Sequence, residues 1–229
     1  MTISIRRALF CARKSGPSLK RILDFGCGYG RVMRALRAEH PDAEITASDL
    51  MDDAVNFCAE TFGAIPAVSN EDVSQISFPE PFDLIWVGSV FTHLNAQGFR
   101  RLLARLVEFL APDGLLVFTV HGRTALWIFE NQKLHKGPVA QANFAALKDS
   151  FYKEGFGFME YNPNLIALLA DQRGAKVSQG SYGFSCCRTE WVCREIGEHP
   201  AIKLLSYHEG GWSNNHDVVT VQRPAVLRV

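Results

Sequence analysis

The chain has 229 residues, a length that allows one α/β domain with a buried core and at most a small cap. Its 24 lysines and arginines equal its 24 aspartates and glutamates, so it lacks the broad positive charge that binds a nucleic-acid backbone. No apolar run reaches the roughly 18 residues needed to span a bilayer. We therefore expect one cytoplasmic domain over residues 1–229 that binds neither nucleic acid nor membrane, and leave its oligomeric state open.

Residues 1–15 are rich in arginine and contain no acid, which is also a property of transit peptides. However, Ile5, Leu9 and Phe10 are spaced as on one face of a helix, and we favour an amphipathic first helix. The six cysteines show no paired C-x-x-C spacing, so we expect free thiols and no structural zinc site.

From Arg21 onward, short apolar runs alternate with helical patterns, which is typical of a parallel sheet flanked by helices. The helical stripe after the second strand ends at Gly63, and Asn95 is a plausible N-cap for the helix that runs to Leu110. The first five strands are predicted at residues 22–25, 44–48, 65–68, 82–87 and 115–120.

The regular alternation breaks over residues 122–182, where helical pieces mix with glycine, proline and aromatic residues and no buried strand is evident. We interpret this segment as an inserted cap. Regularity returns with a helix that Thr189 can cap, followed by a sixth strand at 202–207 and a seventh at 217–222.

A glycine-rich turn, Asp24-Phe25-Gly26-Cys27-Gly28-Tyr29-Gly30, follows the first strand and leads into a helix. Such a turn lets a ligand approach the backbone and the helix N–H groups. The dinucleotide fingerprint G-x-G-x-x-G would need its third glycine at Arg31, where the large side chain opposes close helix–strand packing. The pattern therefore argues against nicotinamide cofactors.

The spacing acid-x-G-x-G-x-G over residues 24–30 resembles the first motif of class I S-adenosylmethionine-dependent methyltransferases. Residues 82–89 resemble the fourth-strand motif of that family, and residues 110–115 resemble its turn into the fifth strand. The resemblance implies a Rossmann-like three-layer α/β sandwich. Its seven-stranded sheet is mostly parallel with an antiparallel last strand, and the inserted cap lies between strands five and six.

S-adenosylmethionine is the co-substrate that the resemblance implies. Asp49, at the end of the second strand, would accept hydrogen bonds from the ribose hydroxyls, and Glu71 or Asp72 would reach the adenine amino group. Asp83 opens the fourth strand, where its carboxylate could serve only to fix a loop and not to bind the donor. Trp86 is expected in the hydrophobic core rather than in contact with the donor. The candidate donor-binding residues are Asp24, Gly26, Cys27, Gly28, Gly30, Asp49, Leu50, Met51, Asp72 and Ser89.

Acceptor-side residues should follow the carboxyl ends of the parallel strands. His93 lies after strand four and is a candidate general base, because its reference pKa is near neutral. The alternative for each of these side chains is a loop or packing role. Besides His93, the candidates for acceptor binding are His121, Tyr182, Trp212, His216 and Asp217, with His93 and His216 as catalytic candidates.

Five aromatic side chains in or beside the cap could enclose an organic substrate, although a satellite hydrophobic core explains them equally well. They are Phe151, Tyr152, Phe156, Phe158 and Tyr161.

We therefore predict methyl transfer to an oxygen or nitrogen of a small molecule by in-line displacement, with no metal. The alternatives are a catalytically inactive donor-binding or partner-binding module and, less favoured, a nicotinamide-dependent reductase.

Overall fold

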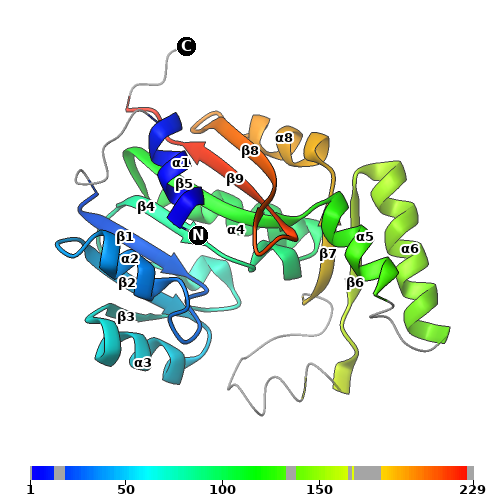
Figure 1. The fold of residues 1–229 in the computed structure, drawn as a ribbon, viewed down its shortest axis with the longest axis horizontal. Coiled ribbons are helices and arrows are strands. Elements are labelled where there is room, and N and C mark those ends of the chain that lie inside the picture. Colours follow the sequence, from blue (N-terminus) through cyan, green and yellow to red (C-terminus); the bar gives the residue numbers. More distant parts are fainter. Residues whose placement is uncertain (1, 13–18, 133–137, 165–166, 168–181, 226–229) are drawn as a thin grey trace.

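The computed structural model describes residues 2–12, 19–132, 138–164, 167 and 182–225 (Figure 1). The helices are α1 (Thr2–Cys11), α2 (Met33–Glu39), α3 (Asp52–Phe62), α4 (Ala96–Glu108), α5 (Arg123–Asn131), α6 (Pro138–Glu154) and α8 (Thr189–Gly197), with the short 3-10 helices η2 (Val73–Gln75) and η3 (Phe91–His93). The strands are β1 (Arg21–Phe25), β2 (Glu44–Asp49), β3 (Ile65–Val68), β4 (Phe82–Val87), β5 (Leu110–His121), β6 (Phe156–Glu160), β7 (Gly183–Cys187), β8 (Lys203–Trp212) and β9 (His216–Gln222).

Seven of the strands form one sheet in the order β3-β2-β1-β4-β5-β9-β8. Strands β1 to β5 are parallel to one another, whereas β9 is antiparallel to both of its neighbours, β5 and β8. This topology confirms the predicted Rossmann-like sandwich with an antiparallel last strand. It also brings the carboxyl ends of β1, β2, β4 and β5 and the start of β9 to one edge, where ligands of such sheets bind.

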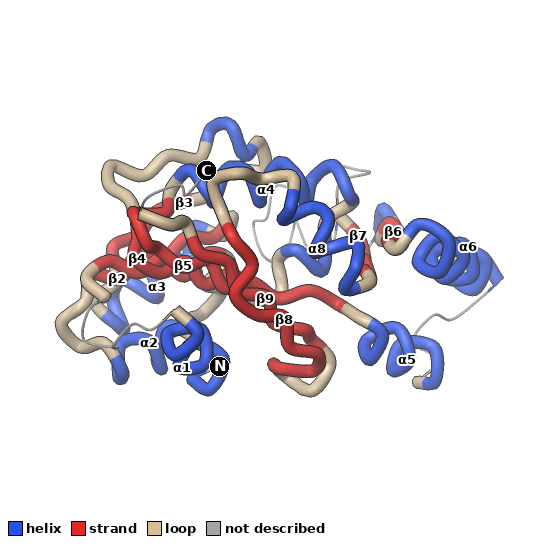
Figure 2. Tube along the Cα trace, turned by 90° about the horizontal axis from the view of Figure 1, so that it is seen from above, coloured by secondary structure: helices blue, strands red, loops and turns tan. Residues whose placement is uncertain are grey.

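Helices cover both faces of this sheet, as Figure 2 shows from above. On one face, Ile5 of α1, Leu36 of α2 and Cys58 of α3 join the hydrophobic cluster that includes Leu84 and Trp86 of β4. On the opposite face, α4 and α8 pack against the alternate residues of the same strands. A sheet that is buried on both faces explains why its central strands are continuous apolar runs.

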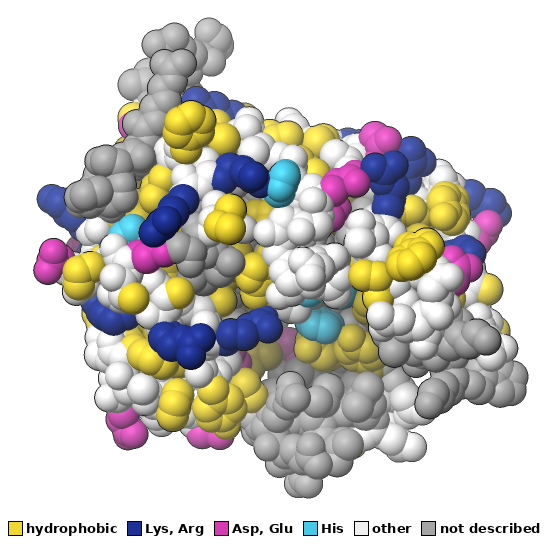
Figure 3. Space-filling model, in the orientation of Figure 1, with side chains coloured by type: hydrophobic (Ala, Val, Ile, Leu, Met, Phe, Trp, Pro, Cys, Tyr) yellow, Lys and Arg dark blue, Asp and Glu magenta, His cyan; other side chains and the backbone are white. Residues whose placement is uncertain are grey.

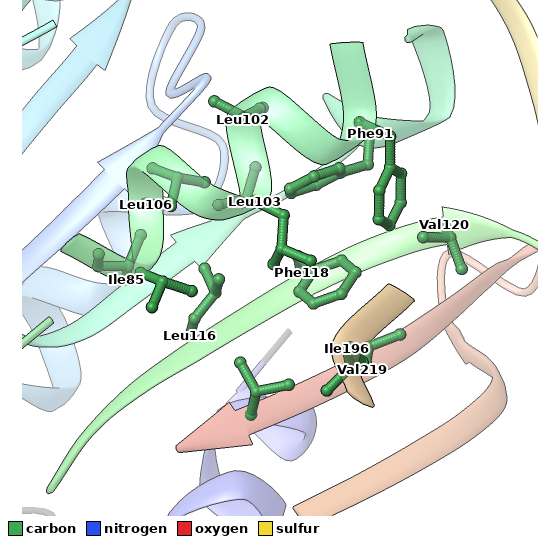
Figure 4. Close-up of a cluster of buried hydrophobic side chains, with 14 of the residues drawn as sticks. Ile85, Phe91, Leu102, Leu103, Leu106, Leu116, Phe118, Val120, Ile196 and Val219 are labelled. Atoms are coloured by element: carbon green, nitrogen blue, oxygen red, sulfur yellow. The ribbon is translucent and has the colours of Figure 1, made fainter. Parts of the chain in front are cut away.

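Helix α4 illustrates how the sequence produces this packing. The Asn95 side chain accepts a 2.8 Å hydrogen bond from the backbone N–H of Gly98 and so caps the helix, as predicted. Leu102, Leu103 and Leu106 follow at helical spacing and are buried in one cluster, and Leu103 and Leu106 point toward the strands in Figure 4. Truncating one of these buried leucines to alanine should cost about 2–5 kcal/mol.

The cap between β5 and α8 contains a two-stranded antiparallel sheet that the sequence analysis did not predict. Strand β6 pairs with β7 from Phe156↔Cys187 to Glu160↔Gly183, so the inserted elements continue to Cys187, beyond the expected end at residue 182. The expectation that the cap lacks a buried strand was wrong. Gly157 lowers the apparent strand propensity of this segment in the sequence. The fold requires a glycine there, because a Cβ would collide with the backbone carbonyl of Leu147.

Three local expectations also need correction. Phe10 is 83% exposed, although Ile5 and Leu9 of the same helix are buried as predicted. Arg188 rather than Thr189 is the N-cap residue of α8, and it makes no side-chain capping bond. Strand β8 extends to Trp212, so much of the expected loop between strands six and seven is a β-ribbon. No helix within the described residues is long and apolar enough to cross a membrane.

Candidate active site at the carboxyl edge of the sheet

The glycine-rich turn after β1 is a tight, left-handed loop. Gly26, Gly28 and Gly30 all have positive φ angles, of 76°, 48° and 75°. A Cβ on Gly26 would lie 2.4 Å from the Val90 side chain, and one on Gly30 would lie 2.3 Å from Phe62, so these two glycines permit packing. A Cβ on Gly28 would meet nothing within 4 Å. Gly28 is therefore the glycine that faces open space, as expected of the position that a ligand approaches.

Asp49 closes this loop from the end of β2. Its Oδ2 accepts a 2.8 Å hydrogen bond from the backbone N–H of Gly28, and its Oδ1 accepts one of 3.2 Å from the N–H of Met51. A carboxylate has about four acceptor sites, so Asp49 keeps capacity for the two hydroxyls of a ribose. This geometry fits the predicted donor role, with Leu50 and Met51 half-buried beside it.

Asp24 lies beneath the loop and is buried. Its Oδ2 has no hydrogen-bond partner among the described residues. Burial, together with the nearby Asp49 charge, raises the pKa of Asp24 to about 7. A buried carboxyl group with an unused oxygen is suited to a cationic ligand group, which would favour its ionised form.

The remaining donor candidates occupy different positions. Asp72 follows β3, but its carboxylate accepts bonds from the Ser74 backbone N–H and hydroxyl and caps η2. Asp83 lies at the start of β4, opposite the ligand edge, where its Oδ2 accepts bonds from the N–H groups of Lys20 and Arg21. This contact agrees with the loop-fixing interpretation of Asp83. Cys27 is buried, and burial strongly raises the pKa of its thiol.

A cavity of about 250 Å³ opens beside the glycine loop. Its walls combine the loop with the two residues that precede α2, the end of β4 and the last residue of β8. They are Gly26, Cys27, Gly28, Tyr29, Arg31, Val32, Trp86, Gly88 and Trp212. The ring of Trp212, which was predicted on the acceptor side, borders the glycine loop and stacks beneath the Arg31 guanidinium, and its centroid also lies 4.9 Å from that of His216.

Three histidines meet at the neighbouring part of the edge. His121 ends β5 and is the register partner of His216, which begins β9, and their ring centroids lie 4.7 Å apart. His93 of η3 lies close to them on the cap side, with its ring 4.8 Å from that of Tyr182. The structure thus brings together three candidates that are 123 residues apart in sequence, from His93 to His216.

Backbone carbonyls fix the tautomers of two of these rings. His93 Nδ1 lies 3.0 Å from the Gly183 carbonyl oxygen, and His121 Nδ1 lies 3.2 Å from that of Ser185. A carbonyl can only accept, so Nδ1 carries the proton in each ring and Nε2 carries the lone pair. The two rings belong to η3 and β5, and both carbonyls come from β7 of the cap, so the cap orients these rings.

Ser89 and Asn215 orient the third ring. Asn215 Oδ1 accepts a 2.7 Å bond from His216 Nδ1, and the Ser89 hydroxyl can donate to His216 Nε2 at 3.3 Å. Ser89 itself has a φ of 62°, and its backbone N–H donates to Thr119 Oγ1 at 2.8 Å. The strained backbone of this residue, which follows β4, aims its hydroxyl at His216.

All three histidines are held neutral. Burial lowers the pKa of His121 to about 3, with further lowering by His216 and His93. Burial, His93 and Arg31 lower that of His216 to about 4. Burial also lowers the pKa of His93, while its bond to Gly183 opposes the shift. These rings are therefore neutral near pH 7, and each can accept a hydrogen bond through its unprotonated nitrogen.

The two remaining acceptor candidates, Tyr182 and Asp217, have different surroundings. Tyr182 forms part of the aromatic wall over His93, together with Tyr161, whose hydroxyl lies 3.2 Å from His93 Nδ1. Asp217 is buried and committed to the β8–β9 ribbon, where it accepts bonds from the Tyr207 hydroxyl and the Gly210 N–H. Burial raises the pKa of Asp217. Its contact with an acceptor stays a prediction.

The five cap aromatics lie in different surroundings, because Phe156 and Phe158 pack with the main core and Phe151 and Tyr161 with a satellite cluster. Phe151 is buried in the cluster with Phe144 and Leu147, while Tyr152 is 61% exposed. Only Tyr161 of the five contacts a candidate histidine. Arg31 and Asn215 also border the site but were not predicted to do so, and their only signal in the sequence is a position next to a candidate residue.

Comparison with known proteins agrees with this geometry. A family model described as a methyltransferase domain matches residues 22–114. Over this range the chain is similar to methyltransferase domains. Within it lie the glycine loop, Asp49 and His93. The described residues contain no group of three or more His, Cys, Asp or Glu side chains that could hold a metal ion.

Curated relatives of the domain act on different acceptors. A malonyl-[acyl-carrier protein] O-methyltransferase from Bacillus cereus is 31% identical over 117 residues, covering 50% of this chain and 40% of that protein. A tRNA1(Val) (adenine(37)-N6)-methyltransferase from Vibrio parahaemolyticus is 31% identical over 123 residues, covering 51% and 52%. The chain thus spans about half or less of the length of these relatives.

Solved structures share the fold over almost the whole chain. An S-adenosylmethionine-dependent methyltransferase from Clostridium acetobutylicum aligns with a TM-score of 0.61 at 11% identity, covering 97% of this chain and 90% of that one. An amino pentose methyltransferase from Micromonospora echinaspora aligns with a TM-score of 0.57 at 13% identity, covering 97% and 90%. At such low identity the likeness shows a common fold.

Proposed function

We propose that the protein transfers the methyl group of S-adenosylmethionine to a hydroxyl or amino group of a small molecule. The observation that carries this proposal is the juxtaposition of a donor cradle and three neutral histidines on one sheet edge. Gly28 and Asp49 form the cradle, and His93, His121 and His216 lie beside it.

On the donor side, Asp49 would hold the ribose hydroxyls, and Asp24 would face the cationic part of the donor. The unused Asp24 Oδ2 and the open space at Gly28 support this placement. The donor supplies an electrophilic methyl carbon on a sulfonium. The methyl group moves to the acceptor oxygen or nitrogen as the carbon–sulfur bond breaks, and the acceptor proton must leave.

On the acceptor side, His93 is our candidate general base. Its Nδ1–H is bound to Gly183, so its Nε2 lone pair is the atom able to receive that proton. His216 is the second candidate, oriented by Ser89 and Asn215. Both rings are neutral near pH 7 because burial lowers their pKa values, so neither must first lose a proton.

A small acceptor fits the surface better than a nucleic acid does. The formal net charge is zero, and basic, acidic and hydrophobic side chains are interspersed over the face shown in Figure 3. The phosphate contacts that dominate nucleic-acid binding need clustered lysine and arginine. The aromatic wall of Tyr161 and Tyr182 beside His93 suits an organic ring or chain.

The test is formation of S-adenosylhomocysteine from S-adenosylmethionine in the presence of small hydroxyl and amine compounds, with bulk tRNA as a separate arm. We expect turnover with a small compound and none with tRNA. Turnover with tRNA alone would contradict the proposed acceptor class. No turnover despite donor binding, over a broad compound set, would favour the inactive donor-binding module.

Once an acceptor is found, single-turnover rates at saturating donor separate the histidines. His93→Ala should slow the chemical step by about 10²–10⁴ while leaving donor affinity unchanged, because general-base catalysis contributes that much. His216→Ala is the matched comparison on the β9 side. An unchanged rate for His93→Ala with a collapse for His216→Ala would move the base to β9, and no effect of either would leave alignment alone as the mechanism.

A further inference from the structure

Three polar side chains at the ligand edge of the sheet form a chain of hydrogen bonds. The Ser89 hydroxyl oxygen lies 3.3 Å from His216 Nε2, and His216 Nδ1 lies 2.7 Å from Asn215 Oδ1. An amide oxygen can only accept, so Nδ1 carries the proton and the Nε2 lone pair faces the serine hydroxyl. A serine, a histidine of this tautomer and an orienting side chain, in this order, are the parts of a nucleophilic triad.

The backbone holds Ser89 on a sharp turn between β4 and η3. Its φ of 62° lies in the left-handed region that residues with a side chain rarely adopt. The bond from its N–H to Thr119 Oγ1, at 2.8 Å, ties this turn to β5. Serine nucleophiles of hydrolases occupy a strained turn between a strand and a helix, because such a turn exposes the hydroxyl at the edge of the sheet. The conformation of Ser89 is of this kind.

The triad borders space that a small molecule can enter. Ser89 is partly exposed, and the preceding residue, Gly88, lines the cavity of about 250 Å³ beside the glycine loop. Trp212 lines the same cavity, and its ring centroid lies 4.9 Å from that of His216. Drug-sized ligands occupy about 300–1,000 Å³, so this cavity suits a compact substrate with a short acyl group.

We propose that Ser89, His216 and Asn215 form a hydrolytic centre that cleaves small carboxylic esters through an acyl-serine. Ser89 Oγ bonds to the carbonyl carbon of the ester while its proton passes to His216 Nε2. The carbon–oxygen bond to the alcohol then breaks, and His216 returns the proton to the departing oxygen. Water attacks the acyl-serine in the same way, which releases the carboxylic acid and restores the Ser89 hydroxyl.

Asn215 is the positioning residue of this centre. Its amide oxygen holds the His216 tautomer that leaves Nε2 free to receive a proton, but it carries no charge to stabilise the imidazolium that forms. Hydrolysis should therefore be slower than with an aspartate in this place. Thr92 Oγ1 lies 3.3 Å from Ser89 Oγ and restricts the rotation of the nucleophile.

The experiment measures hydrolysis of p-nitrophenyl acetate and locates the transferred acetyl group by peptide mass spectrometry. It contains no methyl donor, so its outcome is independent of the proposed methyl transfer. We expect the acetyl group on Ser89, and Ser89→Ala should lower the rate by about 10²-fold or more, since the base then has no nucleophile to activate. Ser74→Ala is the matched control, because it removes an exposed serine hydroxyl from η2 and should not change the rate.

Two further variants test the roles of the other members. His216→Ala should lower the rate as much as Ser89→Ala does, whereas His208→Ala, which removes an exposed imidazole from β8, should leave it unchanged. Asn215→Asp keeps the hydrogen bond and adds a charge that stabilises the imidazolium, so it should raise the rate by about 10-fold. An amide with a purely structural role would give no such gain.

Several outcomes would overturn the hydrolytic centre. Equal rates for Ser89→Ala and Ser74→Ala contradict it, as does acetylation of a residue other than Ser89. Folded wild type that neither hydrolyses the ester nor becomes acetylated contradicts it as well. An unchanged rate for Asn215→Asp removes Asn215 from the centre. The unfolding temperature of each variant is recorded, and if His216→Ala does not fold, the acetylated residue in wild type decides.

Discussion

The Oδ2 atom of Asp49 accepts a 2.8 Å hydrogen bond from the backbone N–H of Gly28 and so joins the end of β2 to the loop after β1. The second oxygen of the same carboxylate accepts from Met51, at the start of α3. One side chain therefore sets the width of the proposed donor cradle and offers its remaining lone pairs to the ligand.

Replacing Asp49 by alanine should weaken S-adenosylhomocysteine binding by at least about 10-fold. Each charge-assisted hydrogen bond to a ribose hydroxyl contributes about 1.5–3 kcal/mol, and the Gly28 N–H would also lose its partner. Calorimetry measures the effect. Asp52→Ala, which removes an exposed acid three residues away, is the control and should bind normally; similar losses in both variants would point to general charge effects.

Gly28→Ala should abolish or strongly weaken donor binding while the protein stays folded. Gly63→Ala is a matched control, because both glycines have positive φ, of 48° and 62°, and a Cβ on either meets nothing within 4 Å. Both variants should lose about 1–2 kcal/mol of stability from backbone strain. If Gly28→Ala binds S-adenosylhomocysteine as tightly as Gly63→Ala does, the ligand does not approach Gly28.

Asp24 should make donor binding dependent on pH near neutrality. The pKa of Asp24 is about 7 in the free protein, so its carboxylate becomes ionised as the pH rises from 6 to 8. The ionised carboxylate attracts the ammonium group that S-adenosylmethionine and S-adenosylhomocysteine share. S-adenosylhomocysteine affinity should rise over that interval. In Asp24→Asn the affinity should be lower at pH 8 and the rise should disappear, as followed by calorimetry at several pH values.

The same substitution gives a stability test with a definite sign. The folded-state pKa of Asp24 lies above the ordinary value of 3.8, so its contribution to stability is present at low pH and is lost as pH rises toward 7. Asp24→Asn cannot ionise and should unfold at a higher temperature than wild type at pH 8. A lower unfolding temperature at pH 8 would show that the buried carboxylate has a partner.

His121 should make stability depend on pH in the opposite sense to Asp24, so that the protein is less stable at low pH. Its folded-state pKa of about 3 lies below the ordinary 6.5, so the unfolded chain binds a proton first and stability falls as pH drops below 6.5. At pH 5 this shift should lower the free energy of unfolding by on the order of 2 kcal/mol. His121→Asn, which can keep a bond to Ser185, should flatten the decline between pH 6.5 and 4 in thermal unfolding. His208→Asn, on exposed β8, should leave the slope unchanged.

The strands and the glycine loop after β1 could be predicted because their signals are local. Strands β3 and β4 lie where the apolar runs at 65–68 and 82–87 predicted them, and Gly63 ends α3 with a φ of 62°. The glycine spacing over 26–30 reports directly on backbone geometry. Such features depend on a few adjacent residues, which is why one sequence suffices to find them.

Features that depend on distant residues could not be predicted. The pairing of β6 with β7 joins segments about 27 residues apart, and Gly157 lowers the apparent strand propensity of β6. Trp86 looks like any buried aromatic residue in sequence, because only the sheet register pairs it with Asp24 of β1. The grouping of the three histidines likewise required the antiparallel placement of β9 next to β5.

The central claim, that this sheet edge binds the methyl donor, is tested most directly by thermal unfolding with S-adenosylhomocysteine, NAD and NADP in parallel. At a concentration of about 100 times Kd, a ligand stabilises the native state by about 2.7 kcal/mol. For a domain of this size that should raise the unfolding temperature by roughly 5–10 °C. We predict such a rise with S-adenosylhomocysteine and none with the nicotinamide dinucleotides. An equal rise with NAD, or no rise with S-adenosylhomocysteine at millimolar concentration, would contradict the account.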